Sequence, residues 1–146
     1  YSLLLVGAKG WKDSEIHHKI QQMRMDGLRV IQPTDYVIDE DLPALASGAS
    51  SFAYVSVYEG FGIPPIEAMA CGTPVIVSNN SSLPEACGKA ARYVDAVDTK
   101  EIAKTLEASL TTENKLVETG YLQAQKFNAK AAAEAFIKTI EMAAVK

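Results

Sequence analysis

Residues 52–78 read FAYVSVYEGFGIPPIEAMACGTPVIVS. The stretch begins and ends with a short apolar run, Phe52 to Val57 and Pro74 to Ser78, and such runs are typical of strands buried on both faces. Between the runs, the spacing predicts a helix that begins after Gly62 and ends at Cys71-Gly72. Two such strands joined by a helix form a parallel βαβ unit with a right-handed crossover.

The same alternation extends on both sides of this unit. Further apolar runs predict strands at Leu3 to Val6, Arg29 to Gln32 and Arg92 to Val94. Helices are predicted from about Ser14 to Met25, from near Asp39 or Asp41, and at a short segment with a capping box in Ser82-Leu83-Pro84-Glu85. We therefore expect an α/β chain with a Rossmann-like, doubly wound parallel sheet.

After Val94 the pattern contains helices only. Asp98 is suited to cap the first, a second spans Leu116 to Phe127, and the last runs from Lys130 to about Val145. No internal repeat, low-complexity segment or linker divides the sequence. We expect residues 1–146 to form a single domain with extra C-terminal helices. Because the chain begins without Met and enters an apolar run at once, we expect it to be cut from a longer protein.

Composition excludes several classes of function. The 146 residues carry 14 Lys and Arg against 18 Asp and Glu, a formal charge of −4, with no run of like charges. Such a chain is not expected to bind nucleic acid or an anionic membrane, and its apolar stretches are too short to span a bilayer. Cys71 and Cys87 have neither CxxC spacing nor a His beside them, which is typical of reduced thiols in a cytoplasmic protein.

The candidate site follows the strand at Phe52 to Val57, because ligands of open parallel sheets bind beyond the carboxyl ends of the strands. Gly60 and Gly62 allow close approach and lead into a helix, whose first amides suit a phosphate or diphosphate. Glu59 and Glu67 are expected to face the same crevice, where carboxylates can accept hydrogen bonds from pairs of sugar hydroxyls. The residues indicate a polyhydroxylated anion. A tight glycine turn, with Glu67 favourably placed in the helix dipole, explains them without a ligand.

Other motifs carry less information. Gly7-Ala8-Lys9-Gly10 lacks the Gly-Lys-Ser/Thr of a Walker loop. His17 and His18 are adjacent on a predicted helix and point about 100° apart, so they cannot hold one metal ion from one face. Trp11 is expected to pack at the edge of its loop rather than to contact a ligand.

The stretch from Glu59 to Ile76, in which seven residues separate Glu59 from Glu67, resembles the signature of retaining glycosyltransferases of family 4, which have the GT-B fold. The likeness continues through Asp35 to Pro43, Ser56, Ser78-Asn79, Ser81 to Glu85 and Gly88 to Ala91. It covers roughly two-thirds of the chain, from Leu3 to about Asp98. Glu85 matches a family position near the site and also completes the capping box, so both explanations of this residue stand.

The resemblance implies that the chain is the C-terminal, nucleotide-sugar-binding half of a GT-B enzyme. Such an enzyme transfers a hexose from a donor such as GDP-mannose or UDP-glucose to a glycan or lipid-linked acceptor, with retention of anomeric configuration. It usually needs no bound metal, and it uses no cofactor beyond the donor.

The resemblance also implies a role for each matching residue. Glu59 would be the catalytic residue, against the donor hexose and near the transferred carbon, and Glu67 would hold the ribose hydroxyls. The residues that would contact the hexose and diphosphate through backbone amides are Gly60, Phe61, Gly62 and Ile63. Tyr36 and Val37 would border the base.

The chain departs from the family pattern in two places. The family begins this domain with a further strand and loop, which carry an Arg and a Lys that neutralise the diphosphate leaving group. Lys9 and Lys12 follow a different strand and are poor substitutes. Near the C-terminus, Phe127-Asn128-Ala129 replaces the aromatic-ended segment often found there, which leaves the docking of the last helix unassigned.

Without an N-terminal acceptor domain and these cations, the chain is expected to bind a donor but not to transfer sugar. A missing strand would leave a sheet edge through which copies self-associate, and the whole enzyme would be cytoplasmic or peripheral to a membrane. One alternative is a non-catalytic GT-B-like module for ligand binding or assembly. Another is a flavodoxin-like receiver, which needs acidic residues after its first strand and an Asp after its third, where this chain has Gly7-Ala8 and Tyr58-Glu59.

Overall fold

The computed structural model describes residues 1–7, 10, 12–33, 37–111 and 115–144. Its contacts divide the chain into two compact units, Tyr1–Leu42 and Pro43–Lys146. The first unit contains β1 (Leu3–Leu4), α1 (Ser14–Met25) and β2 (Val30–Ile31). Here β1 and β2 pair in parallel, with Leu3 opposite Val30, so the unit is a small βαβ element of the predicted kind.

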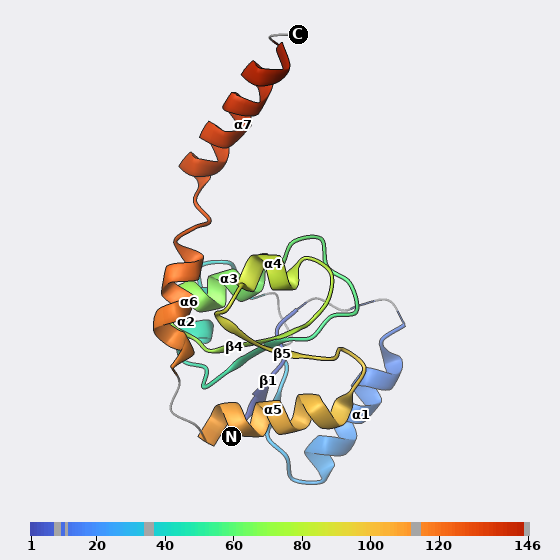
Figure 1. Ribbon diagram of the computed structural model, residues 1–146. Helices are drawn as coiled ribbons and strands as arrows, with labels where there is room; N and C mark the ends of the chain where they lie inside the picture. Colours follow the sequence, from blue (N-terminus) through green and yellow to red (C-terminus); the bar gives the residue numbers. More distant parts are fainter. Residues whose placement is uncertain (8–9, 11, 34–36, 112–114, 145–146) are drawn as a thin grey trace. The chain divides into compact units, whose positions relative to one another are not determined.

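The second unit contains a parallel sheet in the order β3-β4-β5 (Figure 1). Its strands are β3 (Phe52–Tyr54), β4 (Val75–Ser78) and β5 (Ala91–Val94), preceded by α2 (Leu42–Ser47). The connections are α3 (Ile63–Ala70) and α4 (Leu83–Cys87). Phe52 lies opposite Val75, and Val75 opposite Ala91, so all three strands direct their carboxyl ends to the same edge of the sheet.

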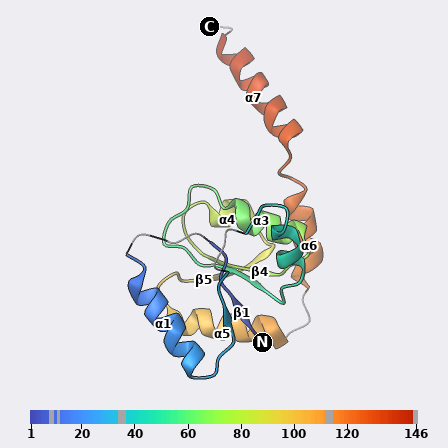
Figure 2. The ribbon, with the colours of Figure 1, turned by 180° about the vertical axis from the view of Figure 1, so that it is seen from behind.

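Helices cover both faces of this sheet. The view of Figure 1 and the reverse view of Figure 2 both place α3, α4 and α6 (Leu116–Ala124) on one face and α5 (Thr99–Thr111) on the other. Side chains alternate along β4 accordingly: Val75 and Val77 belong to the core under α3 and α4, whereas Ile76 is fully buried toward the opposite face. The predicted Rossmann-like, doubly wound α/β fold is confirmed.

The main core lies between the sheet and the helices α3, α4 and α6. Its largest fully buried members include Met69, Val75, Val77 and Leu83. Gly120 of α6 allows the helix to approach Met69, because a Cβ there would lie 3.4 Å from the Met69 side chain. Truncating a buried side chain of this size typically costs about 2–5 kcal/mol of unfolding free energy.

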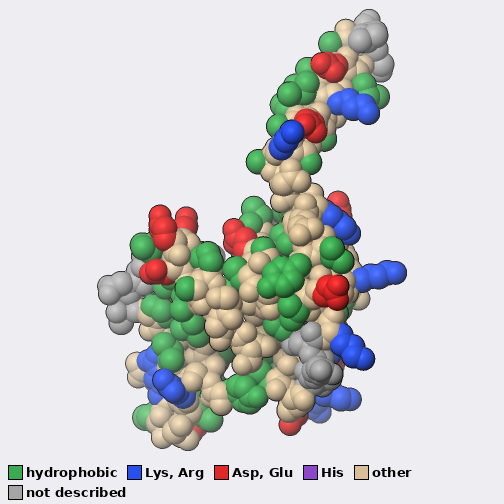
Figure 3. Space-filling model, turned by 90° about the vertical axis from the view of Figure 1, so that its left-hand side faces the viewer, with side chains coloured by type: hydrophobic (Ala, Val, Ile, Leu, Met, Phe, Trp, Pro, Cys, Tyr) green, Lys and Arg blue, Asp and Glu red, His purple; other side chains and the backbone are tan. Residues whose placement is uncertain are grey.

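Two of the C-terminal helices, α5 and α7 (Ala129–Ala144), begin at side-chain caps. The predicted cap at Asp98 is confirmed, since its Oδ1 accepts the amides of Lys100 and Glu101 at 2.9 and 3.0 Å. The last helix, α7, is capped by Asn128, whose Oδ1 accepts the Ala131 amide at 2.8 Å. Figure 3 shows apolar side chains along α7 beside its charged ones. The large apolar side chains of α7 are exposed, with Phe136 at 67% and Ile140 at 52%.

Two expectations about the elements are wrong. Only β4, among the five described strands, is buried along its whole length, whereas both residues of β1 are exposed and β3 lies at the edge of its sheet. An apolar run does not show whether a second strand or a helix will cover it.

The capping box of α4 does not form either, because the Ser82 hydroxyl donates instead to the carbonyl oxygen of Glu59 at 3.2 Å.

Among the described helices, none is long and apolar enough to cross a membrane. Both cysteines are free thiols, Cys71 half-buried and Cys87 buried.

Candidate functional site

The loop between β3 and α3 carries Glu59, Gly60, Phe61 and Gly62 at the carboxyl edge of the sheet. Gly62 precedes α3 with a φ of +102°, a backbone conformation that favours glycine. A Cβ at this position would lie 2.7 Å from Cδ2 of Leu83. The glycine therefore serves two purposes, a left-handed turn into α3 and a close approach of the loop to α4.

The first turn of α3 offers fewer amide donors than its position suggests. Pro64 and Pro65 are its second and third residues, and proline has no backbone N–H. The helix dipole still favours an anion at this end. Amide donors for an anion at this end would therefore have to come from Gly60 to Ile63, and that these residues bind one stays a prediction.

Glu59 is half-buried and is held by three serines. The Ser56 hydroxyl donates to Glu59 Oε1 at 2.5 Å. The main-chain N–H of Glu59 donates to Ser81 Oγ at 3.1 Å, and its carbonyl oxygen accepts from Ser82 Oγ at 3.2 Å. A charge-assisted bond of the kind made by Ser56 orients a carboxylate strongly. The side chain and the backbone of Glu59 are both fixed.

Ser56 is itself tied to the end of β4. Its N–H donates to Ser78 Oγ at 2.6 Å, and the Ser78 hydroxyl donates back to the Ser56 carbonyl oxygen at 2.6 Å. Asn80 Nδ2 donates to the same carbonyl at 3.1 Å. These bonds extend the contact between β3 and β4 beyond their ladder and keep Ser56 in place under Glu59.

Glu59 also affects the pKa of Tyr54, which lies at the end of β3. Burial raises the pKa of the Tyr54 hydroxyl above its ordinary value, and hydrogen bonding to Glu59 and the charge of that carboxylate raise it further. Glu59 thus lies among Tyr54 and Ser56, both from the β3 segment.

Glu67 lies in the second turn of α3 and is exposed, while Ile66, Ala68 and Met69 around it are buried. The helix therefore presents Glu67 to solvent from a fixed backbone. That Glu59 and Glu67 act on one ligand stays a prediction.

The two residues predicted to border a base belong to the first unit. Val37 is half-buried, and Tyr36 lies outside the described residues, as do Lys9 and Trp11. The role of Tyr36 and Val37 stays a prediction.

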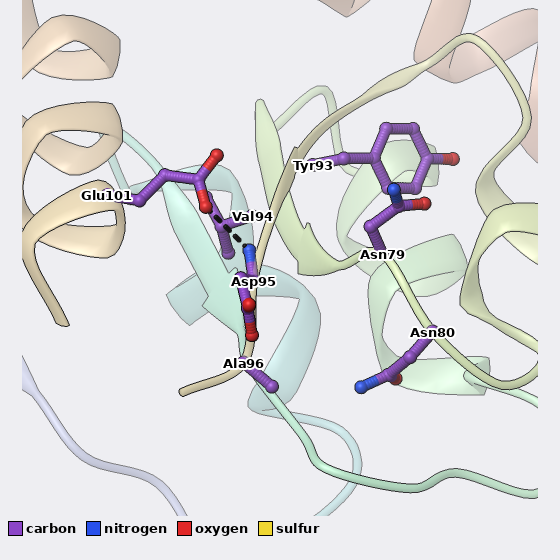
Figure 4. A pocket seen from close by; sticks show the side chains of 7 residues that line it. All are labelled: Asn79, Asn80, Tyr93, Val94, Asp95, Ala96 and Glu101. Atoms are coloured by element: carbon purple, nitrogen blue, oxygen red, sulfur yellow. Dashed lines mark hydrogen bonds between the residues drawn. The ribbon is translucent and has the colours of Figure 1, made fainter. Parts of the chain in front are cut away.

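A hollow of about 350 Å³ lies at the carboxyl ends of β4 and β5, beside the predicted loop rather than over it (Figure 4). Its lining is mainly polar and consists of Asn79, Asn80, Tyr93, Val94, Asp95, Ala96 and Glu101. Asn80 connects it to the predicted site through its bond to Ser56. Reading the residues after β5 in the same way as those after β3 could have found it.

The acidic groups of this hollow have structural partners. Glu101 Oε2 accepts the Asp95 amide at 2.8 Å, the bond drawn in Figure 4, and Asp95 Oδ1 accepts the Val97 amide at 3.0 Å. Elsewhere, His17 pairs with Asp13 at 3.1 Å. Within the described ranges, no group of three His, Cys, Asp or Glu residues could hold a metal ion.

The family of the chain follows from comparison with known proteins. The family model for "Glycosyl transferases group 1" matches residues 1–112. The chain belongs to this family. This group 1 glycosyl transferase chain is 41% identical over 114 residues to O-antigen chain mannosyltransferase B of Escherichia coli, a match that covers 78% of the chain and 29% of that protein.

A second relative of the group 1 chain is the MMP alpha-(1->4)-mannosyltransferase of Mycolicibacterium hassiacum, at 36% identity over 90 residues, or 60% of the chain and 22% of the relative. Among solved structures, sucrose-phosphate synthase from Thermosynechococcus elongatus aligns with a TM-score of 0.83 at 28% identity, covering 99% of the chain and 39% of that protein. The chain thus spans well under half of each of these proteins.

The fold is also similar to that of Anabaena HepE in complex with UDP and glucose. The TM-score is 0.82 at 20% identity, over 97% of the chain and 40% of HepE. The group 1 chain has parallel sheets flanked by helices, and this arrangement matches the fold of GT-B glycosyltransferases.

Proposed function

We propose that this chain is the donor-binding part of a retaining glycosyltransferase of family 4, which transfers a hexose from a nucleotide-sugar. The observation that carries the proposal is the placement of Glu59. Its carboxylate is fixed by Ser56 at the carboxyl edge of the sheet, directly before the loop amides that lead into α3. The similarity to mannosyltransferases supports mannose as the hexose and GDP-mannose as the donor, with UDP-glucose as the alternative.

The donor would be held along the β3–α3 loop. Amides from Gly60 to Ile63 would donate to the diphosphate, and the dipole of α3 would add a favourable field. Glu67 would accept hydrogen bonds from two ribose hydroxyls, since an exposed carboxylate has acceptor sites for both.

Glu59 would act on the hexose. As the diphosphate departs, positive charge develops at the transferred carbon, and a carboxylate held beside it stabilises that charge. Because Ser56 and the backbone contacts already fix Glu59, little reorganisation is needed when the charge appears. Configuration at this carbon would be retained, as the resemblance implies.

The acceptor would bind to a part of the enzyme outside this chain, which spans 29% of the E. coli relative. We therefore expect these 146 residues to bind a donor but not to transfer sugar. Steady turnover of a radiolabelled nucleotide-sugar by this chain alone would contradict that expectation. We expect the whole enzyme to work in the cytoplasm or at a membrane surface.

The binding proposal is tested by calorimetric titration with GDP-mannose, UDP-glucose and free GDP. Glu67→Gln should weaken the binding of the preferred ligand about tenfold or more, because it removes charge-assisted hydrogen bonds. Glu118→Gln, which changes an exposed carboxylate on α6, is the matched control and should leave the affinity unchanged. The proposal fails if none of the three ligands binds, or if Glu67→Gln binds like the wild type.

Self-association through β3 is a separate expectation. In the described part of the chain β3 pairs with β4 alone, and Ala53 in its middle is exposed. An uncovered strand edge can pair with another copy. Light scattering at high protein concentration should detect a dimer, and a strictly monomeric protein would contradict this expectation.

A further inference from the structure

The ring of Phe61 in the β3–α3 loop contacts the ring of Phe127, which lies just beyond the end of α6. The ring centroids are 5.6 Å apart and the planes meet at 82°, an edge-to-face arrangement. This geometry is among the favourable ones for aromatic pairs. It joins two segments that are 66 residues apart in sequence, as the two residue numbers show.

Phe127 is anchored independently of the loop. Its N–H donates to the Ala124 carbonyl oxygen at 3.0 Å, in the turn that ends α6. The next residue, Asn128, caps α7 through the Ala131 amide. The backbone that carries the Phe127 ring is therefore held by hydrogen bonds to α6 on one side and to α7 on the other.

The loop is open beside Phe61, and the Phe61 ring is only partly covered. A Cβ at the preceding Gly60 would meet nothing within 4 Å, so that side of the loop is open. Phe61 itself is 43% exposed and Phe127 39%, so each ring is only partly covered. The contact with Phe127 is therefore one restraint on the Phe61 side chain and, through it, on the direction of the neighbouring amides.

We infer that Phe127 is a positioning residue for the donor loop: its ring holds Phe61 and so orients the amides of Gly60, Phe61 and Gly62. The inference rests on the proposed function, in which these amides bind the diphosphate of the donor. It assigns a role in donor binding to a residue near the C-terminus that does not itself touch the ligand.

The test compares Phe127→Ala with Phe127→Tyr, which keeps the ring, and with Phe136→Ala. Phe136 is a phenylalanine on α7 that is 67% exposed, so the last variant is the matched control. The first readout is the ¹⁵N order parameters of the Gly60, Phe61 and Gly62 amides without ligand. They should fall in Phe127→Ala, and they should keep their wild-type values in Phe127→Tyr and Phe136→Ala.

The second readout is the dissociation constant for GDP-mannose or GDP. Phe127→Ala should raise it about two- to tenfold, the range that an aromatic pair can supply, while Phe127→Tyr and Phe136→Ala bind like the wild type. Thermal unfolding of each variant checks that the fold is intact.

The outcomes separate the two proposals. Unchanged order parameters in Phe127→Ala overturn the inference, whether or not a nucleotide binds. Lowered order parameters with unchanged affinity also overturn it, because the positioning would then not serve binding. If the wild type binds none of the nucleotides but the order parameters fall as expected, the proposed function is contradicted and the coupling between the ring and the loop is supported.

Discussion

The Ser56 hydroxyl donates a 2.5 Å hydrogen bond to the carboxylate of Glu59, three residues further along the same loop. Ser56 is in turn held by Ser78 and Asn80 at the end of the neighbouring strand. The orientation of the proposed catalytic carboxylate therefore depends on the pairing of β3 with β4, and not on the glycine-rich loop alone.

This arrangement predicts the effect of Ser56→Ala. The bonds from Ser78 and Asn80 reach the main chain of Ser56 and survive the change, so the cost in unfolding free energy should be about 1 kcal/mol. Affinity for the complete nucleotide-sugar should fall while affinity for GDP stays the same, because Glu59 is proposed to face the hexose. Urea unfolding and calorimetry measure both quantities.

Ser47→Ala is the control for this change, since the Ser47 hydroxyl bonds only a helix carbonyl, that of Ala44, in the described structure. It should alter neither affinity. Equal losses of nucleotide-sugar and GDP affinity in Ser56→Ala would instead show that the whole loop had shifted.

Glu59→Gln should lower the pKa of Tyr54. The carboxylate raises that pKa because a second negative charge nearby disfavours the phenolate, and glutamine removes this charge. Burial is the larger cause and remains, so the pKa should stay above its ordinary value of 10.0. A pH titration of ¹³Cζ-labelled tyrosines by NMR follows the change. A Tyr54 pKa that does not move in Glu59→Gln would place the two side chains apart in solution.

The two loop glycines should respond differently to alanine. Gly62→Ala combines a φ of +102° with a Cβ 2.7 Å from Leu83, and should cost about 2 kcal/mol or more of unfolding free energy. Gly60→Ala meets nothing within 4 Å and should change stability by less than about 0.5 kcal/mol. If a ligand approaches the loop closely, Gly60→Ala should nevertheless weaken nucleotide binding. Chemical denaturation and calorimetry of both variants separate these effects.

The buried Cys87 predicts a loss of stability in alkali. Burial raises the pKa of its thiol from 9.0 to about 11, so the folded state retains a proton that the unfolded state releases. The contribution of the protonated Cys87 thiol to the free energy of unfolding is complete below pH 9, and it is lost as the pH rises through about 11. Burial, and then the charge of Cys87, raise the pKa of Tyr93 to about 12, which extends the decline beyond the range of Cys87.

Urea unfolding at a series of pH values measures this decline. Cys87→Ala should flatten the part between pH 9 and 11, whereas Cys71→Ala should leave it in place. In the native protein a thiol reagent should modify the half-buried Cys71 quickly and Cys87 only at the rate of unfolding. Rapid modification of both cysteines would show that the core over Cys87 opens readily.

Local signals in the sequence predicted most of the fold. The α1 boundaries, the Asp98 cap and the positions of the strands follow from helical spacing, capping residues and short apolar runs, which act within a few residues. The burial of those strands could not be predicted, because it depends on which elements lie beside them. Thus β3 reads as a buried strand but lies at the edge of its sheet.

The site divides in the same way. Glu59, Gly62 and Glu67 could be selected from their spacing and from their place after a strand. The bond from Ser82 to the Glu59 carbonyl and the contact between Phe61 and Phe127 could not, because each joins segments far apart in sequence. The loss of the α4 capping box also removes that explanation of Glu85, which still lies in the first turn of α4, where the helix dipole favours a carboxylate.

The tight packing of α6 on α3 has a mechanical consequence. A Cβ at Gly72, just beyond α3, would collide with the Tyr121 hydroxyl of α6, and one at Gly120 would lie 3.4 Å from the Met69 side chain, so the two helices pack closely. The pair should move as one stiff unit, and the donor loop and the root of α7 lie together at one end of it, where Phe61 contacts Phe127. A pulling force applied to the C-terminus in a single-molecule experiment should therefore reach the loop before the sheet yields.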